Sequence, residues 1–198
     1  MGEPAEGLVL AQLGRALLLA VLDDWSRVTG VKPRVMAVDA LMTAESDMLA
    51  TSLSQGGVVV STRTKDRRQG TLAIHFPLPI VLRGIAALAG ESKRVDSALR
   101  PEELDVFREL ASRLCAAFND HMRALDLGVQ VSAAVEDLRL FQVSGNGAKL
   151  AVELTKARVG GVRLLAGLAG SEVEALMIVP RTLVSGMVEA YLRHRPAA

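Results

Sequence analysis

Two stretches of the chain follow one pattern: LAIHFPLPIVLRGIAAL at residues 72–88 and ALMIVPRTLVSGMVEAY at residues 175–191. In each, an apolar run typical of a strand ends at a proline, and an apolar stretch typical of a helix follows. Pro77 aligns with Pro180, an offset of 180 − 77 = 103 residues. Two copies of one strand–proline–helix unit predict a fold made of two similar halves.

Working outward from this repeat, we expect each half to run helix, strand, strand, strand, helix. RVMAVDAL at residues 34–41 is aligned with VSAAVEDL at residues 131–138, an offset of 138 − 41 = 97. The expected helices are residues 8–28, 44–53 (short), 79–90, 100–125 and 181–193, and the expected strands are 34–39, 57–64, 70–76, 129–135, 149–159 and 173–179.

The expected fold class is therefore α+β with two pseudo-symmetric halves. The first half covers residues 5–90 and the second covers residues 101–193. A charged linker, ESKRVDSALR at residues 91–100, joins them. Both halves are expected to share one sheet or core, so residues 1–198 are predicted to form a single domain.

Composition excludes several functional classes. A net charge of +1 argues against a protein that neutralises nucleic-acid phosphates. The single cysteine, Cys115, cannot form an internal disulfide and fits a reducing compartment. The histidines lack the spacing of metal ligands, so neither a metal site nor a cofactor is expected. The mean hydropathy is positive, which is consistent with apolar surface covered by a partner.

The N-terminal apolar stretch at residues 7–22 is expected to be a buried helix and not a membrane span. Gln12 and Arg15 interrupt it, and acidic Glu3 and Glu6 precede it where a secretion signal would be basic. It is also shorter than the roughly 20 apolar residues that a span requires.

The stretch RPEELDVFRELASRLCAAFNDHMRAL at residues 100–125 predicts the clearest amphipathic helix in the chain. Its first turn contains proline and two glutamates, which favour a helix start. Together with VKPRVMAVDAL and GTLAIHFPLPIVLRGIAALAG, this helix resembles the chemotaxis phosphatase superfamily, which includes CheC, CheX and the middle domain of FliM. The resemblance covers nearly the whole chain.

The resemblance implies a motif on the long helix of the second half. Enzymatic members have Asp or Ser, three residues, Glu, two residues and Asn, with a proline further along. Their Glu helps to dock a phosphorylated response regulator, and their Asn orients the attacking water. Here Asp105 and Glu109 match, but Ser112 replaces Asn, and Val135 stands at the position of the proline. The first half places Gln12 and Arg15 at the positions of Glu109 and Ser112.

Asp105, Glu109 and Ser112 fall within about 60° of one another on a helix, opposite the apolar stripe. Three readings follow: a catalytic pair of Glu109 and Ser112 in a degenerate motif, a partner-binding face without catalysis, or an ordinary solvated face. Asn119 is expected to extend the same exposed side, so the partner-binding residues are predicted as Asp105, Glu109, Ser112 and Asn119.

The functional expectation is a cytoplasmic chemotaxis or motility protein that binds a CheY-like receiver domain or a related motility-complex partner, with catalysis reduced or lost. The alternatives are an active aspartyl-phosphate phosphatase and a FliM-like scaffold subunit. The resemblance implies no cofactor of its own, since Mg²⁺ would come with the partner receiver domain. Homodimerisation is left open, and neither nucleic-acid binding nor a membrane span is expected.

Overall fold

The computed structural model describes residues 3–30, 34–41, 46–65, 70–89, 99–125, 127–156, 159–168 and 171–193. The first half contains α1 (Glu3–Ala20), the π-helical turn η1 (Val21–Trp25), α2 (Ser26–Thr29), β1 (Arg34–Leu41), α3 (Ser46–Leu53), β2 (Gly57–Arg63), β3 (Thr71–Pro77) and α4 (Leu78–Ala89). The second half contains α5 (Pro101–Leu125), the 3-10 turn η2 (Val135–Asp137), β4 (Arg139–Val143), α6 (Gly147–Thr155), β5 (Val159–Leu168), β6 (Ser171–Pro180) and α7 (Arg181–Arg193).

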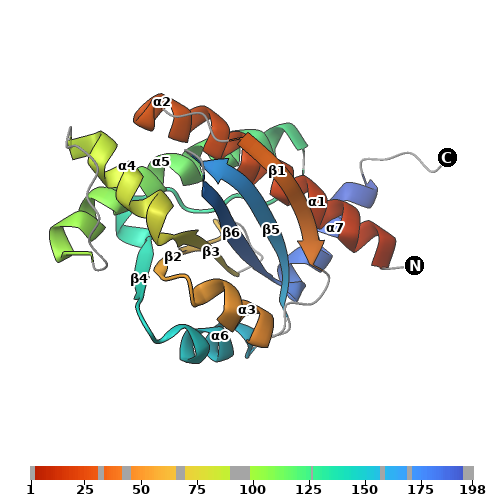
Figure 1. Cartoon of the computed structure of the whole chain (residues 1–198). Helices are drawn as coiled ribbons and strands as arrows, with labels where there is room; N and C mark the ends of the chain where they lie inside the picture. The colour runs from red at the N-terminus through yellow and green to blue at the C-terminus, as the bar shows by residue number, and fades with distance from the viewer. Residues whose placement is uncertain are drawn as a thin grey trace.

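The strands form one antiparallel sheet in the order β1-β5-β6-β3-β2-β4 (Figure 1). Exchanging β1 with β4, β2 with β5 and β3 with β6 reverses this order, so the sheet has a pseudo-twofold axis between β3 and β6. Ile74 and Met177 are partners at that axis. Their separation, 177 − 74 = 103, equals the offset between Pro77 and Pro180. The predicted α+β fold of two pseudo-symmetric halves is therefore confirmed.

The short helix predicted at residues 44–53 is confirmed as α3, and the second half has a corresponding helix, α6, that was not predicted. The predicted strand at residues 149–159 is wrong: residues up to Thr155 form α6, and β5 begins at Val159. Leu150, Ala151 and Leu154 pack together against the sheet, which is a helical spacing. A short apolar run containing valine fits both a strand and a helix. Here the helical conformation is favoured because it packs the apolar side of the run against the sheet.

The predicted strand at residues 129–135 is also wrong as an element. Only Val131 forms a β-bridge there, with Thr64, and η2 interrupts the chain before β4 begins at Arg139. The counterpart of β1 is thus β4 and not the stretch at residues 131–138. The predicted linker, residues 91–100, lies outside the described residues except for Leu99 and Arg100.

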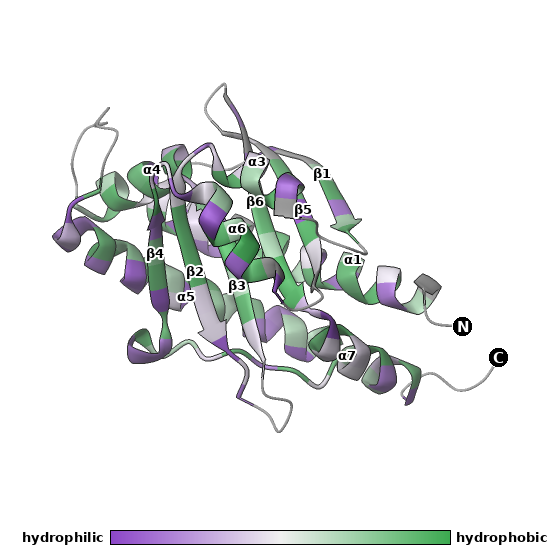
Figure 2. Cartoon of the chain, turned by 90° about the horizontal axis from the view of Figure 1, so that it is seen from below, coloured by the Kyte–Doolittle hydropathy of each residue, from purple (hydrophilic) through white to green (hydrophobic). Residues whose placement is uncertain are grey.

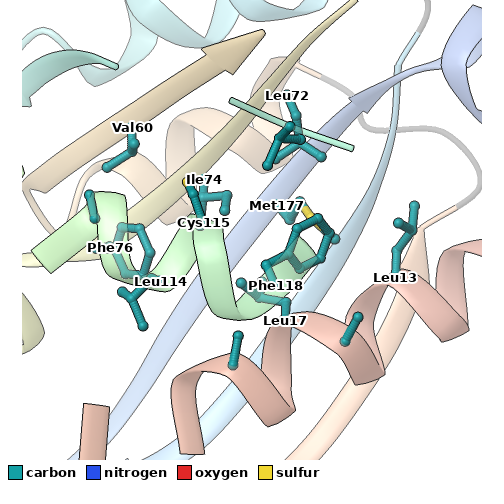
Figure 3. Packing of buried hydrophobic residues seen from close by; sticks show 14 of the residues in the cluster. Leu13, Leu17, Val60, Leu72, Ile74, Phe76, Leu114, Cys115, Phe118 and Met177 are labelled. Atoms are coloured by element: carbon teal, nitrogen blue, oxygen red, sulfur yellow. The ribbon is translucent and has the colours of Figure 1, made fainter. Parts of the chain in front are cut away.

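Helices cover both faces of the sheet. On one face, α1, α4, α5 and α7 enclose the larger core, part of which Figure 3 shows. In this core Phe76 packs edge-to-face on Phe107, with ring centroids 5.6 Å apart. On the other face, α3 and α6 contact each other and cover a smaller cluster that includes Leu49, Val59 and Ala151. The alternation of side chains along each strand assigns them to these two cores.

The helical stretch Ala5–Thr29 is, by length and composition alone, apolar enough to cross a membrane. In this structure α1 lies against the sheet and α5, and Val9, Leu10, Leu13 and Leu17 are buried in the larger core. Both a core helix and a membrane span are apolar, so composition does not separate them. The packing favours the core helix that the sequence predicts.

Candidate functional site

The candidate site lies on the outer side of α5. Arg100 directly precedes this helix, and its backbone N–H donates to the Glu103 carboxylate at 2.7 Å, which satisfies one of the unpaired donors at the helix start. The opposite side is buried against the core through Phe107, Leu110 and Leu114. We call the exposed side the α5 outer stripe; it consists of Glu102, Asp105, Glu109, Arg113, Ala116, Asp120 and Arg123.

Asp105 and Glu109 are both exposed on this stripe, one helical turn apart. The Asp105 carboxylate pairs with Arg108 on the same helix. Glu109 has no hydrogen bond or ion pair to any other residue in the part of the chain that the structure describes. Its carboxylate is therefore free to accept hydrogen bonds from another molecule at little desolvation cost to this chain.

Ser112 is half-buried, and its hydroxyl makes a hydrogen bond within the chain. Its Oγ donates to the backbone carbonyl of Ala133 at 2.5 Å. In the enzymatic members of the superfamily that this chain resembles, this position is an asparagine whose amide reaches outward. Here it is Ser112, a short side chain that is hydrogen-bonded within its own chain. Ser112 lies beside Glu109 as predicted, but its hydroxyl hydrogen is directed toward residue 133 and not outward.

Asn119 does not extend the exposed side, and this expectation is wrong. The residue is 9% exposed, and its amide makes two hydrogen bonds with the backbone of Val131. Nδ2 donates to the Val131 carbonyl and the Val131 N–H donates to Oδ1, each at 2.8 Å. Asn119 thus holds the chain in place after α5, and its amide is directed into the chain and not toward solvent.

Asn119 and Ser112 bind the same segment, residues 129–134, which folds back along α5. Its other side joins the end of β2: Ser132 N–H donates to the Arg63 carbonyl at 2.7 Å. Helical periodicity alone cannot reveal such a returning segment, because it makes no helix or strand of its own. Val135, the position at which the resemblance expects proline, begins η2 beside this segment.

The first half presents no second copy of the stripe. Arg15 is exposed on α1, whereas Gln12 is half-buried and its Oε1 has no hydrogen-bond partner among the described residues. Leu8 is 51% exposed on the same helix. The exposed sides of the two long helices therefore differ in chemistry: α5 carries Asp105 and Glu109, whereas α1 carries Leu8 and Arg15.

A buried polar cluster that the sequence analysis missed lies under α3. His75 is fully buried, and its Nε2 is 3.0 Å from the carbonyl of Gly56. Burial lowers the pKa of His75 below its ordinary value of 6.5, against smaller raising effects from that carbonyl and from Glu174. Nearby, Ser52 Oγ donates to Glu174 at 2.6 Å. The apolar setting of the histidine gave no sequence signal for this contact.

Within the described residues, Cys115 is not a reactive thiol and the possible metal ligands do not cluster. Burial raises the pKa of Cys115 to about 12, which keeps the thiol protonated and unreactive. Cys115 lies in the core beside Leu114 and Ile74 (Figure 3). Among the described residues, no group of three or more His, Cys, Asp or Glu side chains is placed to hold a metal ion.

No protein-family model and no curated protein sequence matches the chain. Solved structures match its fold. FliY of Thermotoga maritima is 14% identical with a TM-score of 0.72, over 97% of this chain and 98% of that one. A FliM middle domain from Vibrio alginolyticus is 11% identical with a TM-score of 0.64, over 92% and 99%. A CheC-like protein from a Shewanella species is 12% identical with a TM-score of 0.57, over 85% and 96%.

These likenesses confirm the fold that the sequence suggested: this chain has the architecture shared by CheC, CheX, FliY and the FliM middle domain. The identities are low, so the sequence has diverged far from those proteins, and the shared architecture does not specify what this chain binds.

Proposed function

We propose that this chain is a chemotaxis or motility protein that docks a CheY-like receiver domain, or a related motility-complex partner, through the α5 outer stripe without catalysing dephosphorylation. The observation that carries the proposal is the contrast between Glu109 and Ser112. Glu109 is exposed and unpaired within the described residues, whereas the Ser112 hydroxyl is bonded to Ala133. The docking carboxylate is kept and the water-positioning amide is missing.

Catalysis of this kind depends on placing a water molecule in line with the phosphoryl group. An amide can both donate to and accept from that water without titrating. Ser112 is shorter and its proton is already committed. Asn119 carries an amide, but both ends of it are satisfied by Val131 inside the chain. Neither residue supplies what the reaction requires.

The site itself is proposed to need no cofactor. A receiver domain that binds Mg²⁺ would bring the ion with it, as the resemblance implies. The protein is proposed to work in the cytoplasm, where such receivers act. Its core helix α1 and the reduced, buried Cys115 are compatible with that compartment.

The proposal is tested by titrating a phosphorylated CheY-like receiver from the same genome into the protein by calorimetry. Glu109→Arg should weaken binding at least about tenfold. It replaces a negatively charged acceptor with a positive charge at the point where the partner is expected to donate hydrogen bonds. The matched control is Glu172→Arg, the same charge reversal at an exposed residue of β6, on the face of the sheet that α3 covers. Equal binding by wild type and Glu109→Arg would contradict docking at this stripe.

A second candidate, a scaffold subunit of a flagellar switch, is favoured by the extent of the structural match. Solved Helicobacter pylori structures with the same fold include a FliG–FliM complex, at 14% identity and a TM-score of 0.59. A scaffold would bind its partner equally well whether or not a receiver is phosphorylated. An active phosphatase, the remaining alternative, would turn the receiver over.

A further inference from the structure

The helices α3 and α6 cover only part of their face of the sheet. Figure 2 looks onto this face, and the ends at which β2 stops and β3 and β4 begin extend beyond both helices. The cluster beneath the helices includes Val59, Ala73 and Val143, one residue from each of these three strands. Residues two or four positions further toward the uncovered ends therefore lie on the same face, beyond the helices.

Five residues occupy this uncovered area, and we call them the basic sheet patch: Ser61 and Arg63 of β2, Thr71 of β3, and Arg139 and Phe141 of β4. In the strand register Arg139 lies opposite Ser61, and Arg63 lies opposite Thr71. The two arginines are thus diagonal neighbours on one face, at a Cα–Cα spacing of about 7–8 Å that their long side chains can bridge. Ser61 is half-buried and the other four residues are exposed.

The two arginines of the patch have no acidic partner among the described residues. By contrast, Arg163, on the same face of the sheet, pairs with Asp39 at 2.8 Å. The acid nearest to Arg139 in the sequence is Asp137, and its carboxylate accepts a hydrogen bond from the Ser132 hydroxyl at 2.5 Å instead. Two positive charges are therefore left to attract a negatively charged partner.

Phe141 gives the patch an apolar side. It is 45% exposed, whereas the other three phenylalanines of the chain are buried. Arg139 is two residues away on the same strand, so its side chain lies beside the ring on the same face. Val59, opposite Phe141 on β2, belongs to the cluster that α3 and α6 cover. The ring thus lies at the border between that cluster and the two positive charges.

We propose that the basic sheet patch is a docking surface for an acidic segment of a partner protein. Two carboxylates of the segment pair with Arg63 and Arg139, and an apolar side chain next to them packs on Phe141. A guanidinium presents a planar fork of N–H donors that matches a carboxylate in a bidentate pair. The hydroxyls of Ser61 and Thr71 add hydrogen-bond donors beside these pairs.

The patch suits a protein segment better than a nucleic acid. Single-stranded nucleic acids bind to sheet surfaces by stacking successive bases on several aromatic rings, and this patch has one. The net charge of the chain is +1, so the chain lacks the excess of positive charge that neutralises a phosphate backbone. A short acidic segment requires only the two local charges and the ring.

The patch is independent of the docking that we propose for α5. That helix packs into the larger core, on the opposite face of the sheet. A partner on the α5 outer stripe therefore leaves the basic sheet patch open, and the chain can hold two partners at once. Loss of either interaction does not remove the other.

A displayed library of random twelve-residue peptides tests the proposal on the full chain. The selected sequences should be enriched in Asp or Glu beside Leu, Phe or Tyr. The best of them, labelled with fluorescein, should bind in solution by fluorescence anisotropy. Combining Arg63→Glu with Arg139→Glu should weaken this binding at least about tenfold, because both bidentate pairs become repulsions. Arg15→Glu, at an exposed arginine of α1 on the other face of the sheet, is the matched control and should bind as wild type does.

Phe141→Ala separates the apolar contact from the charges. It should weaken binding a few-fold and leave the salt dependence intact, whereas the double reversal should remove the salt dependence. Circular dichroism confirms that each variant is folded. A selection that yields no peptide whose binding depends on Arg63 and Arg139 would overturn the proposal. So would a labelled single-stranded oligonucleotide that competes with the peptide and binds more tightly, since the occupant would then be a nucleic acid.

Discussion

At the scale of single residues, the amide of Asn119 shows why a helical pattern does not identify a site. From the sequence alone, Asn119 can be either exposed or buried on α5. It is buried because residues 129–134 fold back along the helix and bond to its amide. Asp105 and Glu109 were correctly expected to be exposed, because no described segment folds back over them. Ser112 falls between these cases: its place beside Glu109 was predictable, but its bond to Ala133 was not.

Replacing Asn119 with alanine should destabilise the protein strongly. The change leaves the buried N–H and C=O of Val131 without partners, at about 1–3 kcal/mol for each group. Urea unfolding should therefore show a loss of about 2–5 kcal/mol. Ser112→Ala, which frees a single carbonyl at a half-buried site, is the matched comparison and should cost about 1 kcal/mol. Similar losses from both would contradict the double role of Asn119.

Replacing Glu109 with alanine should leave folding unchanged within about 0.5 kcal/mol, because the side chain is exposed and has no partner within the described residues. Partner binding should fall in the same variant. Thermal unfolding and calorimetric binding measured on one preparation separate the two effects. A large loss of stability would show that Glu109 has a structural role.

His75 should make stability depend on pH. Burial lowers its pKa in the folded protein, so the unfolded chain binds the proton more readily. Its contribution is intact above pH 6.5 and is lost as the pH falls toward the folded pKa. His75→Gln, which keeps a donor for Gly56, should show a smaller loss of stability between pH 7 and pH 5 than wild type. Parallel curves for the two proteins would contradict this cause.

At the scale of elements, β3, β6 and the helices after them were predictable because a proline marks each junction. α6 was not predictable, because its nine residues contain a short apolar run that fits both the periodicity of a helix and that of a strand. The place of β4 was missed for another reason. The true counterpart of β1 lies beyond η2, and the sequence echo at residues 131–138 is not a structural one.

Gly84 tests the packing of α4 on its neighbours. A Cβ there would lie 2.6 Å from Leu110 and 2.7 Å from the ring of Trp25. Alanine favours a helix by about 1 kcal/mol over glycine, but overpacking costs about 1–3 kcal/mol and the rigid Trp25 ring cannot move aside easily. Gly84→Ala should therefore lower the free energy of unfolding. A stabilised variant would mean that this contact relaxes freely.

At the scale of the whole molecule, the halves depend on each other. Three of the five strand pairings join one half to the other: β1 with β5, β3 with β6, and β2 with β4. The repeat in the sequence predicted this symmetry but not the interleaving, because pairings between halves leave no local pattern. The proposed docking carboxylates do not follow this symmetry, because α5 exposes Asp105 and Glu109 whereas α1 exposes Leu8 and Arg15.

Each half expressed alone should therefore fail to fold as a monomer. A piece covering residues 101–193 would expose the edges that β1, β3 and β2 cover in the full chain. Coexpression with residues 1–100 should restore a soluble complex with the circular dichroism of the intact protein. A cooperatively unfolding monomer from either piece would contradict the single-sheet account.

The most direct test of the central claim is the decay of a phosphorylated CheY-like receiver from the same genome, measured with and without this protein. The account predicts an unchanged decay rate together with a complex that Glu109→Arg weakens. Faster decay that disappears in Glu109→Ala would contradict it, because a helix with Ser112 in place of asparagine would then still catalyse the reaction.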